Sequence, residues 1–316
     1  MDSLSKKKVD EGNQLLADAA KAMKTSLFKR KPDLDTAADA YSKAGTCFKT
    51  AKDFQNAIQA FQNAAQCYEQ NNSFFSAAKQ YEQVGIIANE IKSFSLVYNS
   101  FFKSAELMIL NGTRDSAGIL LERGASMLKT TDPESSLKLV KRAIQVAEVE
   151  DKNHQIVTMY ENAVNLALKI EQYTEAIELV DNSLELLEKI GTSEQIIRYI
   201  LTVCLIHLSK DDWVSAKNYL EKMKQRFSLS CRADELLEIY EEKDDEKFKN
   251  LIKNYLGYAV DNEALKIANR IIKSKEWISS IQEHNAPENK NSIQKNSSHV
   301  NEVKELDEEE FADGLL

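Results

Sequence analysis

Glycine and proline are scarce in this sequence. Only 9 of its 316 residues are glycine, and its 3 prolines are Pro32, Pro133 and Pro287. Few positions therefore force a regular element to end, and no run of β-branched residues lies between turn dipeptides, as a strand would require. These absences point to an all-α chain.

Long apolar runs are missing as well. No stretch approaches the roughly 18 to 20 apolar residues of a membrane span, and the N-terminus lacks the apolar segment of a secretory signal. We therefore expect a cytoplasmic protein. Its cysteines, Cys47, Cys67, Cys204 and Cys231, show no CxxC spacing. They are expected to be buried thiols rather than redox or metal-binding groups.

Residues that could carry out catalysis do not converge in this sequence. His284 and His299 lie in a polar stretch near the C-terminus, and His154 and His207 have no second ligand at metal-binding spacing. There is no Gly-rich phosphate loop, no GxSxG and no HExxH. The sequence thus predicts no enzyme, no metal site and no cofactor. The net charge of −9 disfavours a nucleic-acid partner, because phosphate neutralisation needs a basic face.

What the sequence does contain is a repeat of about twenty residues. When the sequence is written in rows of twenty residues, each row has a large residue, a small or apolar residue three positions later, and then a pair of apolar residues. This spacing places the side chains on one stripe of a helix, so each row predicts one helix and a short turn. Stacked hairpins can bury such a stripe, whereas one hairpin cannot. The first three rows contribute Tyr41, Ala44, Cys47 and Phe48, then Phe61, Ala64, Cys67 and Tyr68, then Tyr81, Val84, Ile87 and Ala88.

The predicted fold is an all-α, right-handed solenoid of helical hairpins. It is similar to tetratricopeptide repeats but has longer helices, about fourteen in all, the last ending near Ile281. We expect the solenoid to span residues 1–283, with residues 232–283 as a helical cap at its C-terminal end. Residues 284–316 are polar and Asn-rich before they become acidic. They predict a flexible linker and a disordered acidic tail.

A short segment between the first two predicted helices combines apolar and basic residues. Leu27 and Phe28 are followed at once by Lys29, Arg30 and Lys31. An apolar knob flanked by cations suits an anionic bilayer surface, where each basic residue adds about 1 kcal/mol. The alternative is that Leu27 and Phe28 fold back onto the first hairpin.

Two further segments are acidic. Residues 234–246 contain eight Asp or Glu, and Glu238, Glu241 and Glu242 are spaced to share one face of a helix. They form either a site for a basic partner or a solvated face. The chain ends in DEEEFADGLL, where two leucines follow the acidic run.

Taken in order, these features resemble the soluble NSF attachment protein (SNAP) family. The motifs are the LFKRK loop, KPDLDTAADAYSKAGTCFK at the start of the second helix, the LLEIYEE helix and the acidic ending with leucine next to last. The resemblance covers essentially the whole chain, and KPDLD and DEEEFADGLL look most like the gamma form. It implies a non-enzymatic adaptor in vesicle fusion and intracellular transport. In this family several copies lie along a SNARE helical bundle, contact the membrane, and recruit and stimulate the hexameric ATPase NSF, which disassembles the bundle.

The resemblance also implies site residues by position. Leu27 and Phe28 match the membrane loop, together with the cations Lys29, Arg30 and Lys31 that follow. Leu315 matches the leucine associated with stimulating ATP hydrolysis. The implied acidic contacts to NSF are Asp211, Glu238, Glu241 and Glu242.

The basic contacts to the SNARE bundle depart from the family pattern. At the positions where the alpha form carries basic residues, this chain has Gly118 and Thr158. We expect neighbouring cations to replace them. The candidates are Arg114 and Arg123 on the same predicted helix as Gly118, and Lys79 on the equivalent helix two rows earlier.

Two other functions fit an all-helical repeat. A generic scaffold subunit of a coat or other assembly would need neither a membrane loop nor an acidic tail, so the two ends of the chain discriminate. A hydrolase built on a ring of helical hairpins would need a longer chain and aromatic residues exposed in its cavity. The aromatic residues here instead lie at the positions of the repeat that are expected to be buried. The resemblance therefore implies an adaptor peripherally associated with secretory and endosomal membranes.

Overall fold

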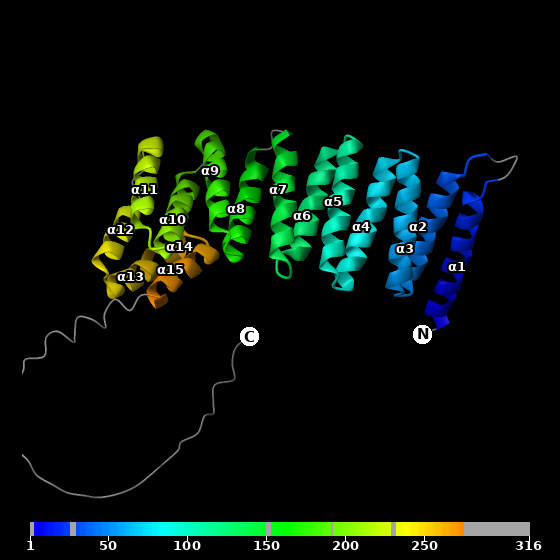
Figure 1. Cartoon of the computed structure of the whole chain (residues 1–316), viewed down its shortest axis with the longest axis horizontal. Coiled ribbons are helices and arrows are strands. Elements are labelled where there is room, and N and C mark those ends of the chain that lie inside the picture. Colours follow the sequence, from blue (N-terminus) through cyan, green and yellow to red (C-terminus); the bar gives the residue numbers. More distant parts are fainter. Residues whose placement is uncertain (1–2, 26–29, 150–152, 191, 229–231, 275–316) are drawn as a thin grey trace, which may run out of the picture. The chain divides into compact units, whose positions relative to one another are not determined.

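The computed structural model describes residues 3–25, 30–149, 153–190, 192–228 and 232–274. Throughout these ranges all regular structure is helical, and no helix there is long and apolar enough to cross a membrane. Figure 1 shows the helices following one another in a row. Eleven long helices come first: α1 (Ser3–Met23), α2 (Leu34–Thr50), α3 (Phe54–Gln70), α4 (Phe74–Glu90), α5 (Phe94–Leu110), α6 (Arg114–Leu128), α7 (Pro133–Val149), α8 (Asn153–Lys169), α9 (Tyr173–Ile190), α10 (Ser193–Ser209) and α11 (Trp213–Phe227).

A group of shorter helices closes the described part of the chain. It comprises α12 (Ala233–Glu242), α13 (Asp245–Leu251), the π-helical turn η1 (Ile252–Leu256), α14 (Gly257–Ala259) and α15 (Asn262–Ser274). Since α13, η1 and α14 run on without a break, the described residues hold fourteen helices. The prediction of an all-α helical solenoid is confirmed. The expected last helix end near Ile281 lies outside the described residues, and the 283/284 boundary stays a prediction.

The solenoid arises because each helix packs mainly against its neighbours in sequence. The small residues of the repeat, Ala44, Ala64 and Val84, are fully buried as predicted. Neighbouring backbones approach closely where a glycine meets an aromatic ring. A Cβ atom built on either Gly85 of α4 or Gly124 of α6 would lie 2.7 Å from the side chain of Phe101 in α5. Phe101 therefore occupies the space that two glycines leave between α4 and α6.

The turns between long helices repeat one backbone conformation. The second turn residue has positive φ in six turns, although five of the six residues carry a side chain. The third residue often caps the next helix: the Asp212 carboxylate accepts a hydrogen bond from the Ser215 N–H at 2.9 Å. This short turn places successive helices antiparallel. The residues with positive φ are Lys52, Asn72, Lys92, Gly112, Glu171 and Asp211.

Candidate partner-binding surfaces

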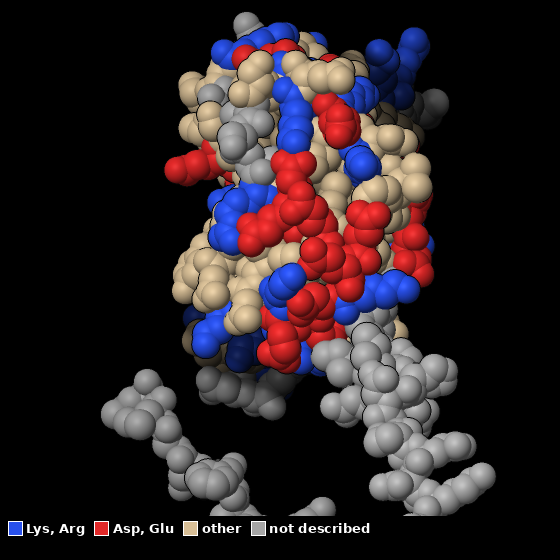
Figure 2. All heavy atoms as spheres, turned by 90° about the vertical axis from the view of Figure 1, so that its left-hand side faces the viewer, with Lys and Arg blue, Asp and Glu red and all other residues tan. Residues whose placement is uncertain are grey.

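One end of the molecule is acidic. Helix α12 buries Leu236 and Tyr240, and on its other side Glu238, Glu241 and Glu242 are exposed. In Figure 2, which faces the end carrying α11 to α13, Asp and Glu gather in one band with Lys and Arg around it. We call Glu238, Glu241, Glu242 and Asp211 the acidic face.

Part of the charge on this end is neutralised internally. The Lys247 ammonium lies 2.7 Å from Glu242 and 3.5 Å from Asp244. No ion pair joins Glu238 or Glu241 to a cation within the described ranges. These two carboxylates therefore remain available to a basic partner. Because Glu242 and Lys247 are both more than half exposed, that pair adds little to stability.

Asp211 belongs to the acidic face because of a tertiary contact. It lies in the turn between α10 and α11 with φ +63°. The Tyr240 hydroxyl of α12 donates a hydrogen bond to its carboxylate at 2.7 Å and lies 3.1 Å from the Leu208 carbonyl oxygen. This contact holds the turn against α12. Of the residues expected to contact NSF, the four that the structure describes therefore lie together.

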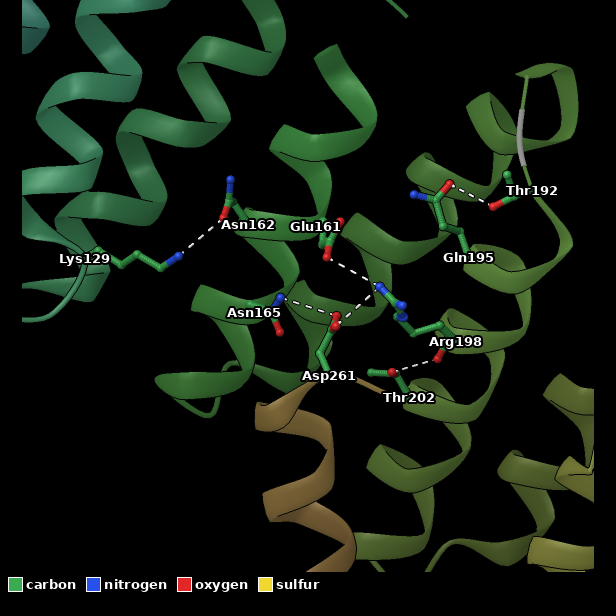
Figure 3. A network of polar contacts seen from close by, with 9 residues as sticks. All are labelled: Lys129, Glu161, Asn162, Asn165, Thr192, Gln195, Arg198, Thr202 and Asp261. Carbon is green, nitrogen blue, oxygen red and sulfur yellow. Dashed lines mark hydrogen bonds and ion pairs between the residues drawn. The ribbon is translucent and has the colours of Figure 1, made fainter. Parts of the chain in front are cut away.

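The C-terminal helices are held on the solenoid by a second set of polar contacts. Arg198 of α10 lies between Glu161 of α8, at 3.5 Å, and Asp261, at 3.4 Å, just before α15. Asn165 of α8 donates to the same Asp261 carboxylate at 3.4 Å (Figure 3). Arg270 of α15 also pairs with Glu171. Residues nearly a hundred positions apart are thereby joined, which fixes α15 against α8 and α10.

The basic residues expected to contact SNARE proteins fall into two groups. Lys79 of α4 and Arg123 of α6 both pair with Glu82, at 3.0 and 2.5 Å. Arg114 is exposed at the start of α6, nine residues before Arg123, and has no ion pair among the residues described. The structure therefore unites Lys79 and Arg123 but does not place Arg114 with them.

Other expected positions are only partly described. Arg30 and Lys31 are exposed, whereas Leu27, Phe28, Lys29, Leu315 and the acidic tail lie outside the described residues. Cys47, Cys67 and Cys204 are buried, as predicted, and burial raises the pKa of the Cys67 thiol. Cys231 is not described. Within the described ranges no group of three or more His, Cys, Asp or Glu could hold a metal ion.

Two comparisons with known proteins point to one family. The sequence model of the soluble NSF attachment protein family, SNAP, matches residues 10–273. The chain belongs to this family. The gamma-soluble NSF attachment protein of Dictyostelium discoideum is 27% identical over 292 residues, which cover 91% of this chain and 90% of that protein. This SNAP chain is therefore gamma-like.

A solved structure is also similar to this SNAP chain. It is a structure of Pseudomonas aeruginosa pilF with 15% sequence identity. The matched region covers 74% of this chain and 97% of the pilF chain, with a TM-score of 0.29. At so low a TM-score, the likeness supports no conclusion about function.

Sequence reasoning missed Glu82 in the SNAP chain. Its side chain is only 8% exposed, yet it pairs with two cations. An acidic residue next to Tyr81 in the buried register was the available signal, but its partner Arg123 is 41 residues away and no local spacing links them. Asp261 and Arg198 were missed for the same reason.

Proposed function

We propose that this SNAP-family chain is a non-enzymatic adaptor that binds SNARE bundles and recruits and stimulates NSF. The observation that carries the proposal is the acidic face, where Glu238 and Glu241 are exposed without a cationic partner among the described residues. Such a face is complementary to a basic partner domain and steers its approach. In this scheme the solenoid of residues 1–283 lies along the bundle in several copies, and residues 284–316 carry Leu315 toward NSF.

Membrane contact is a second part of the proposal. Leu27 and Phe28, with Lys29, Arg30 and Lys31, insert at an anionic bilayer surface and hold the adaptor peripherally on secretory and endosomal membranes. The exposure of Arg30 and Lys31 supports this assignment, because cations attract anionic lipid only from an exposed position. Flotation with anionic liposomes tests it: Leu27→Ser with Phe28→Ser should abolish flotation, and unchanged flotation would remove the membrane role.

The adaptor role is tested by reconstitution. Purified protein, NSF, ATP and a labelled syntaxin-containing SNARE bundle are mixed, and release of the label is followed. We expect release to require this protein. If the bundle is neither bound nor disassembled in its presence, the adaptor role is lost and only a scaffold role survives.

Variants of the two final leucines test whether recruitment of NSF and stimulation of its ATP turnover depend on different residues. Leu315→Ala should leave binding to the bundle and to NSF unchanged while lowering ATP turnover by NSF. Leu316→Ala is the matched control, because it removes the same number of atoms one position away. Equal ATP turnover by the Leu315→Ala variant and the unmodified protein would exclude a role for this leucine.

A further inference from the structure

A groove lies between helices α7 and α9, which run in the same direction because α8 reverses the chain between them. Its central part has a volume of about 390 Å³. Gln145 and Glu148 of α7 line one side, Asn182 and Glu185 of α9 line the other, and Tyr160 of α8 lies between them. Hollows of about 540 and 180 Å³ adjoin it and share lining residues with it. We call the space lined by these five residues the α7–α9 groove.

The groove is open because α7 and α9 both pack on α8 rather than on each other. One step earlier, α5 packs directly on α7, and no contact of that extent joins α7 to α9 among the helices described. The buried side chains of Ile144 and Leu179 form the floor. Lining residues on α9 and the turn before it run from Gln172 to Lys189, so the groove extends along the whole of this 18-residue helix.

The two sides of the groove carry exposed amide groups. Gln145 and Asn182 are both exposed, and each amide side chain offers two N–H donors and a carbonyl acceptor. The Gln145 carbonyl oxygen accepts a hydrogen bond from Arg142 at 3.1 Å, which directs its NH2 group away from α7. A helix has paired its own backbone groups, whereas an extended segment has N–H and C=O groups still to satisfy. Amides on both sides therefore favour an extended occupant.

One half of the groove is negatively charged. Glu148 and Glu185 are exposed on its opposite sides, and the Tyr160 hydroxyl donates a hydrogen bond to Glu148 at 3.1 Å. Burial, then Glu148 and then Glu185 raise the pKa of Tyr160, which shows that both carboxylates lie near this hydroxyl. Lys189 also lines this half, but no ion pair joins either carboxylate to a cation within the described ranges. A cation supplied by a partner would complement this charge.

We propose that the α7–α9 groove binds an extended basic segment of a partner protein, with its backbone on the two amides and a Lys or Arg side chain between Glu148 and Glu185. At 1.5 Å per helical residue the groove is about 27 Å long, which holds about eight extended residues. Charge also sets the position of the segment, because Lys141 pairs with Glu175 in the other half and leaves no surplus carboxylate in that pair.

This site is separate from the surfaces assigned to the adaptor function. Lys79 and Arg123 lie on α4 and α6, and the acidic face lies on α12 and the turn before α11. The groove lies on α7, α8 and α9 and is suited to a partner of the opposite charge to an acidic bundle. The inference therefore goes beyond the proposed function and does not depend on it.

The first test asks whether the full chain prefers basic segments. Capped octapeptides with randomised flanks and a central arginine are arrayed beside the same set with a central glutamate, and retention of the fluorescently labelled protein is measured. We expect retention on the arginine set only. Glu148→Gln with Glu185→Gln should lower it about tenfold. Absence of retention on the arginine set overturns the proposal.

A matched control separates the groove from net charge. Glu178→Gln with Glu221→Gln also removes two exposed carboxylates, but outside the groove. This control should retain the arginine peptides as well as the unmodified protein does. An equal loss from the two double variants overturns the proposal, because the preference would then reflect net charge alone.

The second test removes the amides and keeps the charge. Gln145→Ala with Asn182→Ala should weaken the retained peptides about tenfold without changing the preference for arginine. Asn218→Ala with Gln225→Ala on α11 removes two exposed amides outside the groove and should change nothing. Unchanged binding by the groove variant overturns the extended mode. Binding of the SNARE bundle should be the same in both groove variants, and its loss would overturn a separate site.

Discussion

The acidic face and the two cations Lys79 and Arg123 both form charged surfaces, but the chain builds them differently. Glu238, Glu241 and Glu242 share a face of one ten-residue helix, so the helix alone aligns them. Lys79 and Arg123 lie on two helices and are aligned only because both pair with Glu82. A local surface survives small shifts between helices, whereas a surface assembled from two helices depends on their separation.

The largest expected effect comes from changing that separation. Phe101→Ala should lower the free energy of unfolding by about 3–5 kcal/mol, because the ring is fully buried and fills the space beside Gly85 and Gly124. Since α4 and α6 pack on this ring, bundle binding should weaken while NSF binding at the acidic face is retained. Chemical denaturation and the two binding measurements check this.

Phe61→Ala is the matched control for that prediction. Phe61 is also buried and lies over a glycine, Gly45 of α2, so a similar loss of stability is expected. It lies on α3, whereas Lys79 and Arg123 lie on α4 and α6. If both variants weaken bundle binding equally at a temperature where both are folded, bundle binding does not depend on the separation of α4 and α6.

The features that could be predicted from the sequence are those set within one helix, and the features that could not are those set by contacts between helices. The rows of small and aromatic residues predicted the helices and their buried stripe, because helical spacing is local. The exposure of Glu238, Glu241 and Glu242 was predictable for the same reason. The meeting of Lys79 and Arg123 at Glu82 was not, because Arg123 reaches Glu82 from a different repeat, 41 residues away.

The turns show a further limit. Gly112 and Asn72 are residue types that favour positive φ, but Lys52, Lys92 and Glu171 adopt the same conformation without a local signal. Their conformation is imposed by the packing of the helices on either side. The attachment of α15 through Asp261 and Arg198 likewise depends on contacts far apart in sequence.

Charge reversal on the acidic face gives the next largest effect. Glu238→Lys with Glu241→Lys should weaken NSF binding at least tenfold, because the change adds repulsion where no internal cation compensates. Bundle binding should be unchanged, since the expected bundle contacts Lys79 and Arg123 lie on other helices. Surface plasmon resonance at two salt concentrations measures both. Glu134→Lys on α7, which reverses another exposed carboxylate, is the control, and an equal loss from it would show that net charge alone matters.

A smaller effect is expected from two glycine substitutions, which together measure the contribution of the contact between Asp211 and Tyr240 of α12. Lys92→Gly should raise the free energy of unfolding by about 0.5–1 kcal/mol, because glycine adopts positive φ without the strain of a side chain. Asp211→Gly relieves the same strain but loses the hydrogen bond from Tyr240, worth about 1 kcal/mol. We therefore expect stabilisation from Lys92→Gly alone. Equal stabilisation in thermal unfolding would mean that the Tyr240 contact contributes nothing.

The smallest effect is a pH dependence confined to the half of the chain that carries the acidic face. Burial lowers the pKa of His207 on α10, because desolvation disfavours the imidazolium, whereas residues 74–128, which contain α4 to α6, have no histidine. The unfolded chain therefore binds the proton more readily, so this part of the stability is complete above about pH 6.5 and declines as the pH falls below it. Amide hydrogen exchange at pH 7.5 and 5.5, corrected for intrinsic rates, should show loss of protection in α10 and α11 but not in α4 to α6. His207→Gln should remove the difference, and its persistence in that variant would assign the effect to other groups.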